Sequence, residues 1–219
     1  MKQRLYLIAL TVLILLLWPY PVLFPLKLLV VFFHEASHAI ATIATGGKVD
    51  ELVVIGDQGG HVLSRGGNRF MILSAGYLGS LCWGAAIYFF AMTNRFDRIG
   101  MAILGLAVAA ITAIYGKGLF SWVFGLATGS LMLASAFYLS HRVNDFLLRV
   151  IALTNMLYVP LDIYSDTIQR SEMRSDAAML ADEFGGTTIL WGASWLIASL
   201  VVIYLCLACG LRYGRNNSR

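Results

Sequence analysis

The sequence predicts an all-α polytopic membrane protein, with about six to seven transmembrane helices and a short β-hairpin after the second helix. Of its 219 residues, 59% are hydrophobic and only 13% are charged, whereas soluble chains carry roughly 25% charged residues. Apolar runs recur near the length of about 20 residues that crosses a bilayer as a helix. One glycine-rich stretch with β-prone flanks interrupts them. We therefore expect a single integral-membrane domain over residues 1–219, multi-pass, in the plasma membrane or an inner membrane.

The charges and cysteines exclude other classes of protein. The formal net charge of +4 is spread thinly along the chain and forms no basic cluster, so we expect no nucleic acid partner. Cys206 and Cys209 match a C-x-x-C pattern, but they lie in an apolar run and no second pair accompanies them. We therefore interpret them as ordinary membrane-helix residues and not as a zinc ribbon or redox site.

Residues 5–18 form the first apolar run, which resembles a signal peptide because Lys2 and Arg4 precede it. A small-residue cleavage site is missing and prolines follow, so we interpret the run as a retained first helix or signal anchor. A second helix is expected to begin near these prolines, which are tolerated in the first turn of a helix. It is expected to end at Ala44, before a Gly-Gly pair.

The pattern changes between residues 48 and 67, where two β-prone runs flank a glycine-rich turn at 56–60. This arrangement predicts a hairpin. The long polar stretch at 167–187 is expected to lie outside the bilayer as an amphipathic or loop segment. The remaining apolar runs are predicted to be membrane helices, at about 70–93, 99–115, 119–140, 146–166 and 188–211.

The second helix contains His34-Glu35-Ala36-Ser37-His38, an H-E-x-x-H pattern. Residues four apart share a helix face, so the two histidines can offer their imidazole nitrogens to one tetrahedral zinc ion. Glu35 lies about 100° round the helix, where its carboxylate reaches a metal-bound water and not the metal. This geometry is typical of a metal hydrolase in which the glutamate is the general base.

With four histidines and four glutamates in the chain, a chance match to this pattern is expected on the order of 0.001 times. The alternative is a buried polar network that packs helices together. Charged groups in hydrocarbon are a costly way to achieve packing that small residues supply more easily, so the metal interpretation is favoured.

A catalytic zinc needs a third protein ligand. His61 and His141 fall in the predicted hairpin and at a helix end, where interface or loop roles are more common. Asp162 lies in an apolar run beside Pro160, and it is sixteen residues beyond the expected entry of its helix, as His38 is in its own. Equal offsets in parallel helices mean equal depth, so we predict His34, His38 and Asp162 as the metal ligands.

Two further acids remain open at this point. Asp166 would lie about 6 Å further along the helix than Asp162, at 1.5 Å per residue. It is the next candidate, as a hydrogen-bond partner of a ligating histidine. Asp176, in the polar stretch, ranks third.

These residues together resemble a known family. His34-Glu35-Ala-Ser-His38 in an early membrane helix, a glycine-flanked hairpin after it, and Pro160-Leu161-Asp162 in a later helix resemble the site-2 protease family of intramembrane zinc metalloproteases. The Gly-Tyr-Leu-Gly at residues 76–79 is similar to a pattern of its small, domain-poor peptidase M50B-like branch.

The resemblance implies cleavage of peptide bonds in or near the membrane, with Zn²⁺ as cofactor and a membrane protein as substrate. It implies Asp162 as third ligand and a role for Asn155 in orienting substrate or stabilising the oxyanion, although Ile163 replaces the family's usual glycine after the aspartate. Gly76, Gly79 and Gly84 are more simply interpreted as helix-contact residues.

Several functions remain compatible with the residues. The first is a zinc endopeptidase with Glu35 as general base. The second is a non-hydrolytic metal-binding membrane protein, such as a transporter or sensor. The third is a zinc hydrolase of a non-peptide membrane substrate. The hairpin is expected either to hold an unwound substrate segment as an added strand or to cap the site at the membrane surface. The sequence leaves the oligomeric state open.

Overall fold

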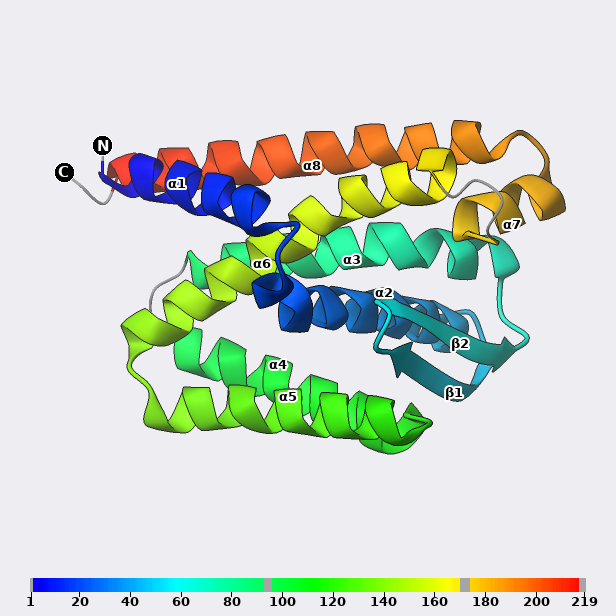
Figure 1. The fold of residues 1–219 in the computed structure, drawn as a ribbon, viewed down its shortest axis with the longest axis horizontal. Coiled ribbons are helices and arrows are strands. Elements are labelled where there is room, and N and C mark those ends of the chain that lie inside the picture. Colours follow the sequence, from blue (N-terminus) through cyan, green and yellow to red (C-terminus); the bar gives the residue numbers. More distant parts are fainter. Residues whose placement is uncertain (1, 93–95, 170–173, 217–219) are drawn as a thin grey trace.

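Helices lying roughly side by side make up most of the molecule in the computed structural model, which describes residues 2–92, 96–169 and 174–216 (Figure 1). A 3-10 turn, η1 (Pro21–Leu23), precedes the second helix, and a π-helical turn, η2 (Ser165–Gln169), follows the sixth. The helices in chain order are α1 (Lys2–Leu17), α2 (Phe24–Ala44), α3 (Arg69–Ala91), α4 (Asp97–Tyr115), α5 (Leu119–Tyr138), α6 (His141–Tyr164), α7 (Asp176–Phe184) and α8 (Thr188–Asn216).

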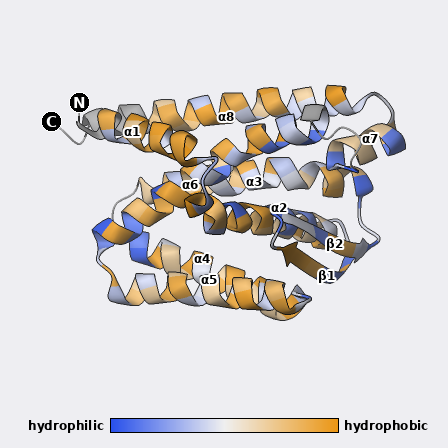
Figure 2. Cartoon of the chain, in the orientation of Figure 1, coloured by the Kyte–Doolittle hydropathy of each residue, from blue (hydrophilic) through white to orange (hydrophobic). Residues whose placement is uncertain are grey.

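Six helices within the described residues are long and apolar enough to cross a membrane. Apolar colouring predominates along these helices in Figure 2. Many of their large apolar side chains are exposed, as expected for helices that contact lipid. The predicted fold class and the multi-pass membrane location are thereby confirmed. The spans are Pro21–Ala44, Arg69–Ala91, Asp97–Tyr115, Leu119–Tyr138, His141–Thr167 and Thr188–Gly210.

The first predicted helix, α1, is not among these six candidate spans, and its apolar part, Leu5–Leu17, is shorter than they are. Its 16 residues extend about 24 Å, against the about 30 Å of a bilayer's hydrocarbon core. In Figure 1, α1 and α2 run in the same direction, away from the end where α8 finishes. Leu7 of α1 and Tyr88 near the end of α3 both lie against Gly210 of α8. α1 therefore lies beside the last part of α8, and the chain continues from it into α2 without reversing direction.

The predicted hairpin consists of β1 (Lys48–Ile55) and β2 (Gly59–Arg65), paired antiparallel directly after α2. Both strands contact α2, and β1 turns a buried face toward the protein with Val49, Leu52 and Val54. The outer edge of β1 is already occupied: the amide of Val54 donates to Ser121 Oγ (2.8 Å), and the amide of Lys117 donates to the carbonyl of Leu52 (3.0 Å). The hairpin is thus fixed between α2 and the α4–α5 connection.

The polar stretch at 167–187 contains the short helix α7, which packs against α3 and α8. Arg69 at the start of α3 donates from Nε to both carboxylate oxygens of Glu183, at 3.0 and 3.1 Å. The rings of Phe70 and Phe184 meet edge to face, 5.5 Å apart. Two contacts therefore hold α7 at the end of α3 that carries the hairpin.

Candidate metal centre

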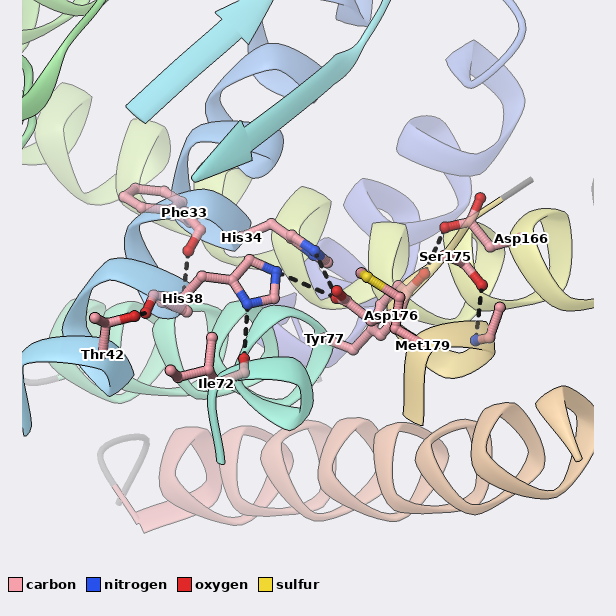
Figure 3. A network of polar contacts seen from close by, with 12 residues as sticks. Phe33, His34, His38, Thr42, Ile72, Tyr77, Asp166, Ser175, Asp176 and Met179 are labelled. Atoms are coloured by element: carbon pink, nitrogen blue, oxygen red, sulfur yellow. Dashed lines mark hydrogen bonds and ion pairs between the residues drawn. The ribbon is translucent and has the colours of Figure 1, made fainter. Parts of the chain in front are cut away.

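The two histidines of α2 converge on one carboxylate. Their rings lie one helical turn apart, with centroids 4.8 Å from each other. His34 Nε2 is 3.1 Å and His38 Nε2 is 3.2 Å from the same atom, Oδ2 of Asp176 (Figure 3). Among the described residues, these three side chains form the group that could hold a metal ion, because their ligand atoms all lie within 4.8 Å of one another. They have the donor set of a three-ligand zinc site.

The third member of this group differs from the residue that the sequence favoured. Asp162 lies on α6 and lines the same cavity as the histidines, but it is not part of the three-atom group. Equal depth in parallel membrane helices favours Asp162, whereas Asp176 lies on α7, a short helix between the last two spans. Its helix reaches the histidines because Ser175 caps it, accepting from the amide of Ala178 at 3.3 Å, and places Asp176 in the first turn.

The carboxyl group of Asp176 is held in its ionised form. It is 8% exposed, and burial alone raises the pKa of such a group. The charge of His38 and the hydrogen bonds from both histidines lower the pKa of Asp176 by more than burial raises it, so the net shift is downward. This shift belongs to the metal-free site, in which the histidines donate to this oxygen; a bound cation would take the place of those protons.

The orientation of His38 is set by the main chain of α3. Its Nδ1–H donates to the carbonyl oxygen of Ile72 at 2.7 Å, as Figure 3 shows. A carbonyl can only accept, so the proton of a neutral His38 lies on Nδ1 and the lone pair lies on Nε2, the atom that faces Asp176. Metal-binding histidines are commonly held by such a second hydrogen bond.

Gly76 of α3 lets the helix backbone lie close to two of these ligands. A Cβ built at this glycine would lie 2.4 Å from His34 Nε2 and 2.5 Å from Asp176 Oδ2. Zinc binds imidazole nitrogen at about 2.0–2.1 Å and carboxylate oxygen at about 2.0–2.2 Å. A side chain here would push His34 and Asp176 away from positions in which they could share an ion at these distances. The donor set of two imidazole nitrogens and one carboxylate oxygen fits zinc, the metal that this chemistry implies.

A family model described as Peptidase M50B-like matches residues 7–206. The chain belongs to this family. The resemblance to site-2 proteases inferred from the sequence is thereby confirmed at the level of the family, which is one of peptidases, and the matched region contains all three members of the group around Asp176. No curated protein and no solved structure gave a significant match.

In this Peptidase M50B-like protein, Glu35 lies against the hairpin. Its side chain is 6% exposed, and a Cβ at Gly60 of β2 would come within 2.8 Å of Glu35 Cγ and 2.9 Å of Oε1. Because Gly60 has no side chain, the strand backbone approaches the carboxylate closely. The hairpin therefore forms one wall around Glu35, next to the two histidines.

A cavity of about 360 Å³ connects these groups. This volume lies within the range of small-molecule and substrate pockets. Residues of α2, β2, α3, α6 and α7 line it, so segments from most of the chain meet there. Besides the histidines, its polar lining includes Glu35, Tyr77, Asp162, Asp166, Arg174 and Asp176.

The other residues that the sequence singled out have different surroundings. Asp166 accepts a hydrogen bond from the Tyr77 hydroxyl. Asn155 is fully buried between helices, where its Nδ2 donates to the carbonyl of Ser80 at 2.8 Å, so it fastens α6 to α3. His61 lies 3.7 Å from Glu51 on the hairpin.

Two of the three glycines interpreted as helix-contact residues do lie at a contact between helices. Gly79 faces Ser37 of α2, and Gly84 faces Met156 of α6. Gly76 instead borders the metal centre. Nothing in the sequence separates Gly76 from the other two. One feature of the sequence pointed weakly to Asp176: it directly follows the capping residue Ser175 in a polar segment.

Proposed function

We propose that this protein is a zinc-dependent intramembrane endopeptidase that cleaves peptide bonds in membrane-embedded or membrane-adjacent protein segments. The observation that carries the proposal is the group of His34, His38 and Asp176, with Glu35 beside it in one cavity. Membership of a peptidase family and six candidate spans support the substrate class. Its partners are then a membrane protein substrate and the surrounding bilayer.

In the proposed site, His34, His38 and Asp176 hold the zinc ion, in place of the set with Asp162. Three protein ligands leave a fourth position open, as in catalytic zinc sites. When bound, zinc supplies a Lewis acid that activates water and polarises the scissile carbonyl. The hydrogen bond from His38 to Ile72 keeps the lone pair of Nε2 directed at the site.

Glu35 is proposed as the general base. It lies next to His34 in the chain and lines the cavity without belonging to the ligand group. From there its carboxylate takes a proton from the attacking water and returns it to the nitrogen of the departing amine. The cavity walls that bury Glu35 also limit access of bulk water, which strengthens the electrostatic interactions within the site.

Strand β2 is suited to hold the substrate. A peptide bond within a helix is shielded by its own hydrogen bonds, so a membrane-spanning substrate has to unwind before attack. The hydrogen bonds that anchor the hairpin to the α4–α5 connection come from β1, and β2 lines the cavity. An unwound segment added to β2 would run past Glu35.

The test is a comparison of wild type with Glu35→Gln, each expressed in a strain that lacks the native gene. The variant should retain zinc, measured by metal analysis of purified protein, and should lose cleavage. In the membrane proteome, the wild type should convert at least one membrane protein into a shorter product that is missing with Glu35→Gln.

Two results would replace this proposal. Zinc binding or flux without any difference in peptides between wild type and Glu35→Gln would indicate a non-hydrolytic metal-binding protein. A difference confined to lipids or other small molecules would indicate a hydrolase of a non-peptide substrate.

A further inference from the structure

Tyr77 connects a proposed metal ligand to an acid that the proposed reaction does not use. This tyrosine of α3 is 2% exposed. Its ring meets that of His34 edge to face, with centroids 5.0 Å apart and an interplanar angle of 84°. Its hydroxyl donates to Oδ2 of Asp166, in the π-helical turn after α6, and both residues are drawn in Figure 3.

The ring of Tyr77 is held from three directions. His34 lies on one side, and Trp195 of α8 lies on another, with centroids 5.1 Å apart and an angle of 42°. The hydroxyl bond to Asp166 fixes the far end of the ring. A phenol ring held only by apolar contacts can tilt, whereas the bond to a carboxylate, a strong charge-assisted acceptor, restricts that tilt.

The two proposed histidine ligands differ in how they are oriented. His38 has a direct bond from Nδ1 to the carbonyl of Ile72. For His34, the contacts are that of Nε2 with Asp176 and the ring contacts with His38 and Tyr77. Metal affinity depends on such supporting contacts, because a ligand that has to be ordered on binding loses part of the binding free energy.

We propose that Tyr77, held by Asp166, is a positioning residue that fixes the imidazole of His34 for metal binding. The proposal rests on the metal centre proposed above and assigns a role to Asp166. The sequence suggested this acid as a direct partner of a histidine, and the structure places the tyrosine ring between them. Asp166 then acts on His34 through Tyr77 and not as a ligand.

The test measures the zinc affinity of purified full-length protein by competition with a chelator of known affinity. Tyr77→Phe removes the hydroxyl and keeps the ring, and should weaken zinc binding about 10-fold, the lower end of the effect of losing a supporting partner. Tyr88→Phe is the matched control. Tyr88 is a fully buried tyrosine of the same helix whose hydroxyl has no hydrogen-bond partner among the described residues, so this variant should bind zinc like wild type.

Variants of Asp166 separate positioning from a simple effect of charge. Asp166→Asn keeps an oxygen that accepts from Tyr77 and should bind zinc more tightly than Asp166→Ala, which loses it. Adding Tyr77→Phe to Asp166→Ala should cause little further loss, because both changes break the same contact. Unchanged affinity in Tyr77→Phe, or losses that multiply in the double variant, would overturn the proposal.

Two measurements distinguish a positioning role of Tyr77 from a purely structural role and from the absence of a metal centre. A merely structural role for the pair would lower the melting temperature of metal-free Tyr77→Phe below that of Tyr88→Phe and leave zinc affinity unchanged. Failure of the wild type to bind zinc would remove the metal centre itself. If the wild type binds zinc and the Tyr77→Phe variant binds it with equal affinity, only the proposed role of Tyr77 is overturned.

Discussion

His34 Nε2 lies 3.1 Å from Asp176 Oδ2, although 142 positions separate the two residues in the chain. A surface helix, α7, thus completes a group whose other members lie in a membrane span. We predict that Asp176→Ala reduces zinc affinity by more than the about 10- to 100-fold typical for loss of an outer partner. Asp162→Ala should have a smaller effect. Metal content and competition titration of both purified variants provide the measurement, and loss of zinc in Asp162→Ala alone would restore the ligand set favoured by the sequence.

Gly76→Ala should abolish zinc binding in a folded protein. The added methyl group would lie 2.4 Å from His34 Nε2, and the nearest atoms are ends of side chains and not backbone. Alanine is also the better helix residue, by roughly 0.5–1 kcal/mol. In wild type, zinc at 100 times its Kd should stabilise the fold by about 2.7 kcal/mol. Thermal unfolding with and without zinc should show this rise in wild type and none in Gly76→Ala.

Gly79→Ala is the contrasting variant on the same helix. Its methyl group would meet Ser37 Cβ at 2.4 Å, at the contact between α2 and α3. It should therefore lower the melting temperature equally with and without zinc, while the zinc-dependent rise remains. Equal behaviour of the two glycine variants would contradict the assignment of Gly76 to the metal centre.

Gly60→Ala should separate catalysis from metal binding. The new Cβ would lie 2.7 Å from the carbonyl oxygen of Val53 on the paired strand and 2.8 Å from Glu35 Cγ. Both the hairpin and the proposed general base would therefore have to shift, whereas none of the three proposed ligands is among the atoms nearest to this Cβ. Because general-base catalysis typically contributes 10²- to 10⁴-fold, we expect kcat to fall by at least about 10-fold with zinc content unchanged.

The neighbouring Gly59→Ala is the control for the hairpin. Its Cβ would approach only the flexible side chain of Ile55, at 3.3 Å, so kcat should stay near that of wild type. A Gly60→Ala protein with normal kcat would show that the position of Glu35 does not depend on this close contact.

The ion pair between Arg69, which lines the cavity, and Glu183 should influence zinc binding through the position of α7. It joins α3 to the helix that carries Asp176, but both side chains are partly exposed. Exposed pairs contribute about 0–1 kcal/mol, so Arg69→Glu should weaken zinc binding by no more than about fivefold. Reversal of both charges, Arg69→Glu with Glu183→Arg, should restore it, and the same chelator competition measures all three proteins. A double variant as weak as the single one would show that the pair does not hold α7.

Much of the fold could be predicted because the hydropathy of a segment indicates whether lipid or water surrounds it. Apolar runs identified the six spans, and the glycine turn at 56–60 identified the hairpin. The first run was the exception. Composition does not reveal whether the chain reverses direction between one apolar segment and the next. Between α1 and α2 it does not reverse.

The part of the candidate site that lies within about one turn of one helix could be predicted from the residues alone. His34, Glu35 and His38 are placed relative to one another by helix geometry, which depends on spacing alone. The acid that meets them, and the reason why Gly76 and Gly60 lack side chains, are visible only in the folded protein. These are contacts between segments distant in the chain, set by how α3, α7 and the hairpin pack against α2. The pattern of residues within one segment does not predict such contacts, because packing depends on the shapes of both segments that meet.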